Sequence, residues 1–199
     1  MNDIVFIIIL IIIQIVFVYL CYYNGKQFFS EREKQGKTTP KIFDISHKFL
    51  PNYSDSDTLH NLLNIVIFSP LVIYPHLIGE FLSYIIPILL FRYITTNTTI
   101  LPKTKNCNDD SFGIFNFING HCYDKLFSGH FACSVIISLL LYHNNLIQSP
   151  VILWLYNALS AYLLLVTRAH YTVDLILGGY VALTSYYLGI NIDFLKNAI

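Results

Sequence analysis

The sequence is short of charge. Only 12% of its 199 residues are Asp, Glu, Lys or Arg, whereas 55% are hydrophobic, and the mean hydropathy is +0.56. Soluble domains carry about 25% charged residues, so a surface covered by water would be hard to build from this chain. The formal net charge is zero, which argues against a partner such as nucleic acid, bound through bulk positive charge. The composition therefore predicts a single domain folded in a lipid bilayer.

Cysteine is also scarce. The four cysteines, at 21, 107, 122 and 133, form no C-x-x-C pair and show no metal-ligand spacing. Cys21 and Cys133 fall in apolar segments and are predicted to be core residues. Cys107 and Cys122 lie in or beside one polar connection and could form a disulfide if that side is oxidising. The sequence predicts no metal site and no other cofactor.

The long apolar runs decide the fold class. A helix that spans hydrocarbon needs about 20 mostly apolar residues, and the first such run lacks the basic start and small-residue cleavage site of a signal peptide, so it is predicted to be a retained anchor. We predict an all-α, polytopic membrane protein with six transmembrane helices and both termini on the same side. The predicted helices cover residues 4–23, 59–75, 77–94, 126–143, 147–167 and 173–190, with polar loops at 24–58 and 95–125.

Two histidine motifs begin helices on the same predicted face. Phe127-Ser128-Gly129-His130 stands at the start of the fourth helix, and His170-Tyr171-Thr172-Val173-Asp174 stands at the start of the sixth. One histidine at a membrane boundary is often only a polar residue at headgroup level. Two of them on one face, one with an Asp four residues later, favour a functional site, because ionisable groups there are costly.

The spacing of these residues suits phosphoryl transfer. Residues i and i+4 share a helix face, so Asp174 can orient the His170 ring and leave its other nitrogen as a nucleophile towards phosphorus. His130 can then protonate the departing alkoxide. Such chemistry depends mainly on positioning and charge stabilisation, and needs no metal here.

Other polar residues are predicted to bind or support the phosphate. The hydroxyl of Ser128, the backbone at Gly129 and the guanidinium groups of Arg92 and Arg168 are the predicted phosphate-binding groups. The predicted supporting residues are Asp124, Lys125 and Tyr171. For Asp124, an ion pair with Lys125 or Arg92 and a capping role at the fourth helix remain open alternatives.

The motifs also resemble a known family. Residues 122–130, Cys-Tyr-Asp-Lys-Leu-Phe-Ser-Gly-His, resemble the C-G-D-x-x-F-S-G-H-T motif of sphingomyelin synthases, and residues 170–174 resemble their H-Y-T-x-D motif. Arg92, with Thr99 and Leu101-Pro102, is similar to their R…T-x-L-P segment. Residues 167–175 also resemble plant phosphatidylcholine:diacylglycerol cholinephosphotransferase. Both families belong to the type 2 phosphatidic acid phosphatase superfamily, and the resemblance spans roughly residues 40–190.

The resemblance implies roles for three residues: His170 as nucleophile, Asp174 as its orienting partner and His130 as acid and base. Two departures concern the headgroup and acceptor, since Tyr123 replaces a Gly of the motif and Phe131 replaces a Thr. Arg168 stands two residues before His170, and the chain has no Arg-Pro element of the classical phosphatases, which favours transfer over hydrolysis. Pro40 and Asp44 stand where the relatives carry a P-P-x-x-x-D-like element, whose role the sequence does not reveal.

The expected function is a lipid phosphotransferase. It would move a phosphate-linked, phosphocholine-like headgroup from a glycerophospholipid to ceramide or diacylglycerol through a phosphohistidine. A lipid phosphate phosphatase is the first alternative, and a non-catalytic lipid-binding or scramblase-like protein is the second. The basic loops favour a catalytic face in the cytosol. The resemblance instead implies a lumenal or exoplasmic catalytic face, in the Golgi, the endoplasmic reticulum or the plasma membrane. We expect the lumenal or exoplasmic orientation.

Overall fold

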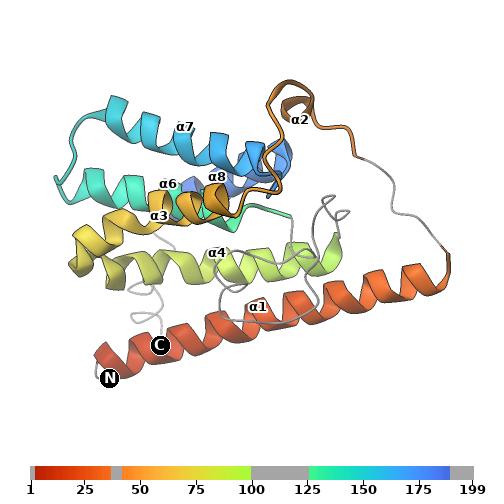
Figure 1. The fold of residues 1–199 in the computed structure, drawn as a ribbon. Helices are drawn as coiled ribbons and strands as arrows, with labels where there is room; N and C mark the ends of the chain where they lie inside the picture. Colours follow the sequence, from red (N-terminus) through yellow and green to blue (C-terminus); the bar gives the residue numbers. More distant parts are fainter. Residues whose placement is uncertain (1–2, 37–41, 100–125, 189–199) are drawn as a thin grey trace.

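The computed structural model describes residues 3–36, 42–99 and 126–188, and in these ranges its secondary structure is all helical, which confirms the all-α part of the predicted fold class (Figure 1). The described helices pack lengthwise, with the loops gathered at their ends. Their bounds are α1 Asp3–Lys34, α2 Ile45–Phe49, α3 Asp57–Ile73, the 3-10 helix η1 Pro75–Leu77, α4 Ile78–Thr98, α6 Gly129–His143, α7 Pro150–Val166 and α8 Thr172–Tyr187.

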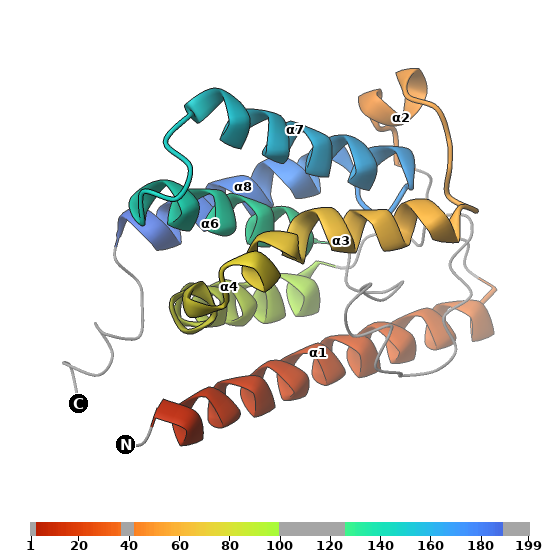
Figure 2. The ribbon, with the colours of Figure 1, turned by 60° about the vertical axis from the view of Figure 1, so that its left-hand side comes forward.

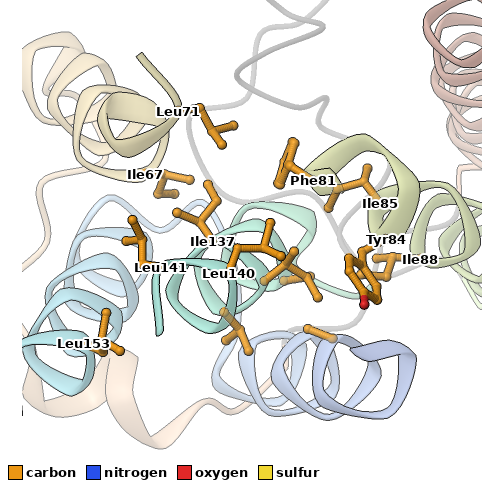
Figure 3. Close-up of a cluster of buried hydrophobic side chains, with 14 of the residues drawn as sticks. Ile67, Leu71, Phe81, Tyr84, Ile85, Ile88, Ile137, Leu140, Leu141 and Leu153 are labelled. Atoms are coloured by element: carbon orange, nitrogen blue, oxygen red, sulfur yellow. The ribbon is translucent and has the colours of Figure 1, made fainter. Parts of the chain in front are cut away.

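Helix α6 lies at the centre of the bundle. It contacts α3, α4, α7 and α8, while α1 packs along α4. Ile136, Ile137 and Leu140 on α6 are fully buried. Figure 3 shows Ile137 and Leu140 in one apolar cluster with Ile67 of α3 and Phe81 of α4. Gly129, His130 and Ala132 of its first turn are buried as well.

Helix α1 is longer than predicted. We expected residues 24–58 to form a polar loop, but α1 continues through the polar stretch to Lys34. Side-chain bonds four residues apart support this part of the helix, including Gln27 Nε2 to Glu31 Oε1 at 3.1 Å. Gly36, with φ of +64°, stands just past the helix end, where glycine commonly accepts a left-handed backbone. The predicted loop also contains the short helix α2, which the sequence pattern did not reveal.

The predicted count of six membrane spans is not confirmed. Among the described residues, one segment of 22 residues, Pro75–Thr96, is long and apolar enough to cross a membrane by length and composition, with a mean hydropathy of 1.7 over its most apolar 18 residues. Three further apolar helices, Thr58–Ile73, Gly129–His143 and Pro150–Val166, have 17 residues or fewer, which is less than the roughly 20 that a straight span needs. The six-span topology therefore remains a prediction.

Both histidine motifs lie at the same end of the bundle. The first turns of α3, α6 and α8 and the last turns of α4 and α7 come together there, and α2 covers the end of α7 (Figures 1 and 2). Asp44 starts α2 by accepting a hydrogen bond from the His47 amide at 3.0 Å. The antiparallel order of the helices thus brings residues from distant parts of the chain to one end.

Candidate active site

A tight turn joins α7 to α8 and carries His170. Thr167 ends α7, and Arg168 takes a left-handed conformation with φ of 57°, which is unusual for a residue with a side chain. The amides of Arg168 and Ala169 donate to carbonyls of the last turn of α7, at 3.2 and 3.1 Å. The chain therefore reverses within a few residues, and His170 is placed just before the first turn of α8.

His170 and Asp174 form the pair that the sequence spacing predicted. His170 Nδ1 lies 3.5 Å from Asp174 Oδ2, and both side chains are buried, with 5% and 0% of their surface exposed. The same carboxylate oxygen accepts a hydrogen bond from the Tyr171 amide at 3.0 Å. Asp174 thus stabilises the start of α8 and orients the neighbouring imidazole at once.

The first turn of α6 is fixed directly to the first turn of α8. Ser128 is the N-cap of α6, and its Oγ accepts a hydrogen bond from the Phe131 amide at 3.2 Å. The Ser128 amide donates to the Asp174 carbonyl at 3.0 Å. A Cβ built on Gly178 would lie 2.5 Å from the Ser128 carbonyl oxygen, so only glycine permits this approach of the two backbones. The two histidine motifs therefore meet through backbone contact.

Arg92 reaches the first turn of α6 from α4. A Cβ built on Gly129 would come within 3.2 Å of Arg92 Cζ and would overlap Nη1. The guanidinium therefore lies directly against the backbone of Gly129. His130 follows on the same turn; its side chain is buried, with its ring edge-on to Phe68 of α3 at a centroid distance of 6.5 Å. The structure brings Arg92, Gly129 and His130 to one place.

The two helix starts differ in charge. The first turn of α6 has no acidic residue and has the Arg92 cation beside it. The first turn of α8 contains Asp174, and Asp44 contacts it as well, since Asp44 Oδ2 accepts from the Thr172 amide. A helix N-terminus attracts anions, but carboxylates already occupy that position on α8. The start of α6 is therefore the more favourable of the two for an anion.

Arg168 contacts the protein more than was expected of a phosphate-binding residue. Its Nη2 donates to the carbonyl oxygens of His47 and Leu50, each at 2.9 Å. Its Nη1 is buried and has no hydrogen-bond partner among the described residues.

Tyr171, predicted as a supporting residue, is the N-cap of α8, and its ring lies against His47 at a centroid distance of 5.3 Å.

Part of the predicted site lies outside the described residues. Asp124, Lys125, Pro102 and the two cysteines of the polar connection, Cys107 and Cys122, belong to residues 100–125, and Pro40 belongs to residues 37–41. Sequence reasoning missed His47, whose Nε2 lies 3.0 Å from the His170 carbonyl oxygen. The only signal was its place three residues after Asp44, the residue singled out by the resemblance.

The comparisons with known proteins agree with these motifs. Residues 121–190 match the PAP2 superfamily C-terminal family. The match contains all of α6, α7 and α8 and both histidine motifs. The resemblance to this superfamily, predicted from the motifs, is thereby confirmed.

A curated relative is also similar to the chain. It is a phosphatidylinositol:ceramide inositolphosphotransferase from Trypanosoma cruzi (strain CL Brener), 30% identical over 129 residues. The aligned region covers 55% of this chain and 37% of the relative. The chain therefore matches little more than a third of that protein's length.

Proposed function

We propose that this protein is a lipid phosphotransferase that moves a phosphate-linked headgroup from a glycerophospholipid to a lipid alcohol. The observation that carries the proposal is the buried His170–Asp174 pair, with Nδ1 and Oδ2 3.5 Å apart, beside the start of α6. The superfamily match and the relative named as a ceramide phosphotransferase support the same reaction class.

In the first step, His170 would attack phosphorus. With Nδ1 directed at Asp174, the lone pair of Nε2 is the nucleophile, and a P–N bond forms while the bond from phosphorus to the diacylglycerol oxygen breaks. His130 gives its proton to that departing oxygen. The Asp174 carboxylate stabilises the imidazolium as it becomes cationic. Arg92 and the first-turn amides of α6, with Ser128 and Gly129, bind the phosphate oxygens.

In the second step, the acceptor would take the headgroup from His170. Its hydroxyl gives a proton to His130, its oxygen attacks phosphorus, and the P–N bond breaks. Water in place of the lipid alcohol would make the protein a lipid phosphate phosphatase. The match to the phosphatase superfamily keeps this as a second candidate.

The acceptor that we propose is ceramide. The T. cruzi relative is named for ceramide and for an inositolphosphate headgroup, whereas the motifs themselves resemble enzymes of phosphocholine transfer. We therefore propose phosphatidylinositol or phosphatidylcholine as the donor, with diacylglycerol as the competing acceptor. The site would lie at a lumenal or exoplasmic membrane face, which glycan-tag accessibility of the region around residue 54 in sealed vesicles would test.

The test is a liposome assay with the purified protein. Vesicles would contain labelled phosphatidylinositol or phosphatidylcholine with ceramide or diacylglycerol, and parallel vesicles would contain phosphatidic acid. We expect labelled headgroup on ceramide. Release of inorganic phosphate from phosphatidic acid without headgroup transfer would instead establish the phosphatase.

The nucleophile is tested in the same assay. His170→Ala should reduce turnover to background, and a headgroup labelled with phosphorus-32 should form an acid-labile adduct on wild type and not on this variant. His130→Ala should slow turnover because the leaving oxygen is no longer protonated. The matched control is His76→Ala, an exposed histidine of η1. Full activity of His170→Ala would refute the mechanism.

A further inference from the structure

A segment far away in sequence is fastened to the turn that carries His170. We call residues 44–53, which include α2, the strap. It contacts the turn through backbone and side-chain groups over its whole length. At its far end, the Tyr53 amide donates to the Val166 carbonyl at 2.8 Å. The remaining bonds involve residues 168–172, on both sides of His170.

Asp44 contacts the turn on the C-terminal side of His170. Its Oδ2 accepts from the Thr172 amide at 2.6 Å, and its Oδ1 accepts from the Thr172 hydroxyl at 2.8 Å. Thr172 is the first residue of α8, where backbone amides have no partner within the helix. A carboxylate 128 residues away in the chain thus provides the acceptor for α8.

His47 contacts the turn at His170 itself. Its Nε2 lies 3.0 Å from the His170 carbonyl oxygen, and because a carbonyl only accepts, Nε2 carries the proton and donates it. The His47 ring also packs on Tyr171, with centroids 5.3 Å apart. In the opposite direction, Arg168 Nη2 donates to the His47 carbonyl at 2.9 Å. The backbone on each side of the His170 ring is therefore held by the strap.

These bonds exceed what the strap needs for its own structure. The bond from the His47 amide to Asp44 already provides the N-cap of α2. The additional bonds reach the His170 carbonyl and the Thr172 amide, next to the groups that set the His170 ring relative to Asp174. A displacement of about 1 Å at such a site can lower a rate by about 100-fold.

We propose that Asp44 and His47 are positioning residues, which hold the backbone of residues 170–172 so that the His170 imidazole stays paired with Asp174. This inference rests on the proposed function, because it concerns the residue proposed as nucleophile. Neither residue touches the reacting atoms; both act through the backbone of the turn.

The charge states of both groups suit this role. Burial raises the pKa of Asp44, but the hydrogen bonds from Thr172 and His47 together outweigh it, so the pKa lies below its ordinary value. For His47, burial is the largest influence and lowers the pKa below its ordinary value; Arg168 acts in the same direction, while Asp44, Asp174 and the His170 carbonyl oppose it. At neutral pH, Asp44 is therefore a carboxylate with two acceptor oxygens, and His47 is a neutral ring.

Two variants of His47 separate its hydrogen bond from its packing. His47→Phe keeps a ring against Tyr171 and loses the donor, whereas His47→Gln loses the ring and keeps an N–H that can reach the His170 carbonyl. We expect His47→Phe to lower kcat roughly 10-fold or more with KM little changed, and His47→Gln to recover most of the loss. The control is His76→Phe, an exposed histidine whose ring packs on Tyr74.

Asp44→Asn tests the other side of the turn. Its amide group keeps one acceptor oxygen and places an NH₂ opposite either the Thr172 amide or the His47 amide. A backbone N–H cannot accept a hydrogen bond, so one of these two bonds is lost. We expect kcat to fall roughly 10- to 100-fold. Hydrogen–deuterium exchange of residues 170–175 should become faster, without a change for α6. The control is Asp55→Asn in the same connection, because the Asp55 side chain is exposed and accepts a hydrogen bond from the neighbouring Ser54 hydroxyl, at 3.4 Å.

The two readouts distinguish failure of the inference from failure of the proposed function. Wild-type kcat together with wild-type exchange in Asp44→Asn and His47→Phe would overturn the inference. Equal losses in His47→Phe and His47→Gln, accompanied by loss of folded protein, would also overturn it and leave the strap a purely structural element. A wild-type protein that transfers no headgroup would refute the proposed function, and the exchange experiment would still test whether the strap holds the turn.

Discussion

The central helix α6 contacts α7 and α8 in different ways. Towards α7, polar side chains make the contact: Ser134 Oγ lies 2.9 Å from Asn157 Oδ1 and 3.1 Å from Ser160 Oγ. Asn157 Nδ2 also donates to Ser138 Oγ at 2.9 Å. Hydrogen bonds between side chains of this kind hold neighbouring helices together.

Towards α8, the contact depends on the absence of side chains. Gly178 lets the Ser128 carbonyl approach, and Gly179 lies against the ring of Phe131. The distance between the helices is set by backbone atoms, which cannot turn away. The glycine contact lies at the histidine motifs, and the hydrogen-bonded contact lies further along α6. The difference indicates that exact spacing matters at the candidate site and that the α7 contact serves mainly stability.

Among the changes that test this difference, Gly178→Ala should have the largest effect on stability and activity. Its Cβ would lie 2.5 Å from the Ser128 carbonyl oxygen, so α6 and α8 must separate, at a cost of roughly 1–3 kcal/mol. Headgroup transfer should fall roughly 10-fold or more as His130 and His170 move apart. Activity and thermal unfolding in detergent would be measured beside Gly79→Ala, where no atom lies within 4 Å. Equal behaviour of the two variants would contradict the assignment.

Asn157→Leu should act on stability alone. It removes the hydrogen bonds to Ser134 and Ser138 while keeping a similar volume, and interhelical bonds in a bilayer are worth roughly 0.6–1.7 kcal/mol. The midpoint of unfolding should fall, whereas kcat per folded molecule should not change. Asn61→Leu, at an exposed position of α3, provides the control. A large loss of kcat would show that the α7 contact also sets the site.

Gly179→Ala should be milder than Gly178→Ala. Its Cβ would lie 3.1 Å from Phe131 Cε1, and a ring edge can shift where a backbone carbonyl cannot. We expect a loss of unfolding free energy of roughly 1 kcal/mol or less and nearly normal turnover. If Gly179→Ala proved as harmful as Gly178→Ala, the helix spacing would depend on the whole glycine pair and not on Ser128 alone.

Lowering the pH should have the smallest effect, and only on the backbone around His170. Because the pKa of Asp44 is below its ordinary value in the folded protein, its stabilising effect is complete above about pH 4, near the unfolded value, and is lost as pH falls through the folded pKa. Exchange at residues 170–175, corrected for intrinsic rates, should therefore accelerate below that pH. Asp44→Asn should flatten the change, and the Ser134–Asn157 contact should show none. An identical profile in Asp44→Asn would contradict the prediction.

Much of the helical pattern was readable from the sequence. The apolar runs indicated where α3, α4, α6, α7 and α8 lie, because hydrophobic runs bounded by polar residues are a local signal. The end of α1 was not readable in this way, since residues 24–34 are polar and were interpreted as loop. The Gln27–Glu31 pair and the glycine at position 36 are the features that could have placed this helix end. Helix α2 was missed because five residues are too few for a periodic pattern.

In the candidate site, too, local contacts were predictable from the sequence and long-range contacts were not. His170 and Asp174 were paired from the sequence alone because their spacing is local and the geometry of one helix turn fixes it. For Arg92 and Gly129, the sequence predicted only that both bind phosphate; it did not predict that the two residues touch. The bond from His47 to the His170 carbonyl was not anticipated, because these residues stand 123 positions apart and no local rule connects them.

The sequence by itself determined the all-α class and the chemical groups at the starts of α6 and α8, since both follow from composition and from spacing within one helix. Only the tertiary structure decided how those groups are held together. The approach of Ser128 to Gly178 and the strap across the His170 turn depend on how separate helices pack. Packing is a property of the whole chain, because the partners in each contact lie far apart in the sequence.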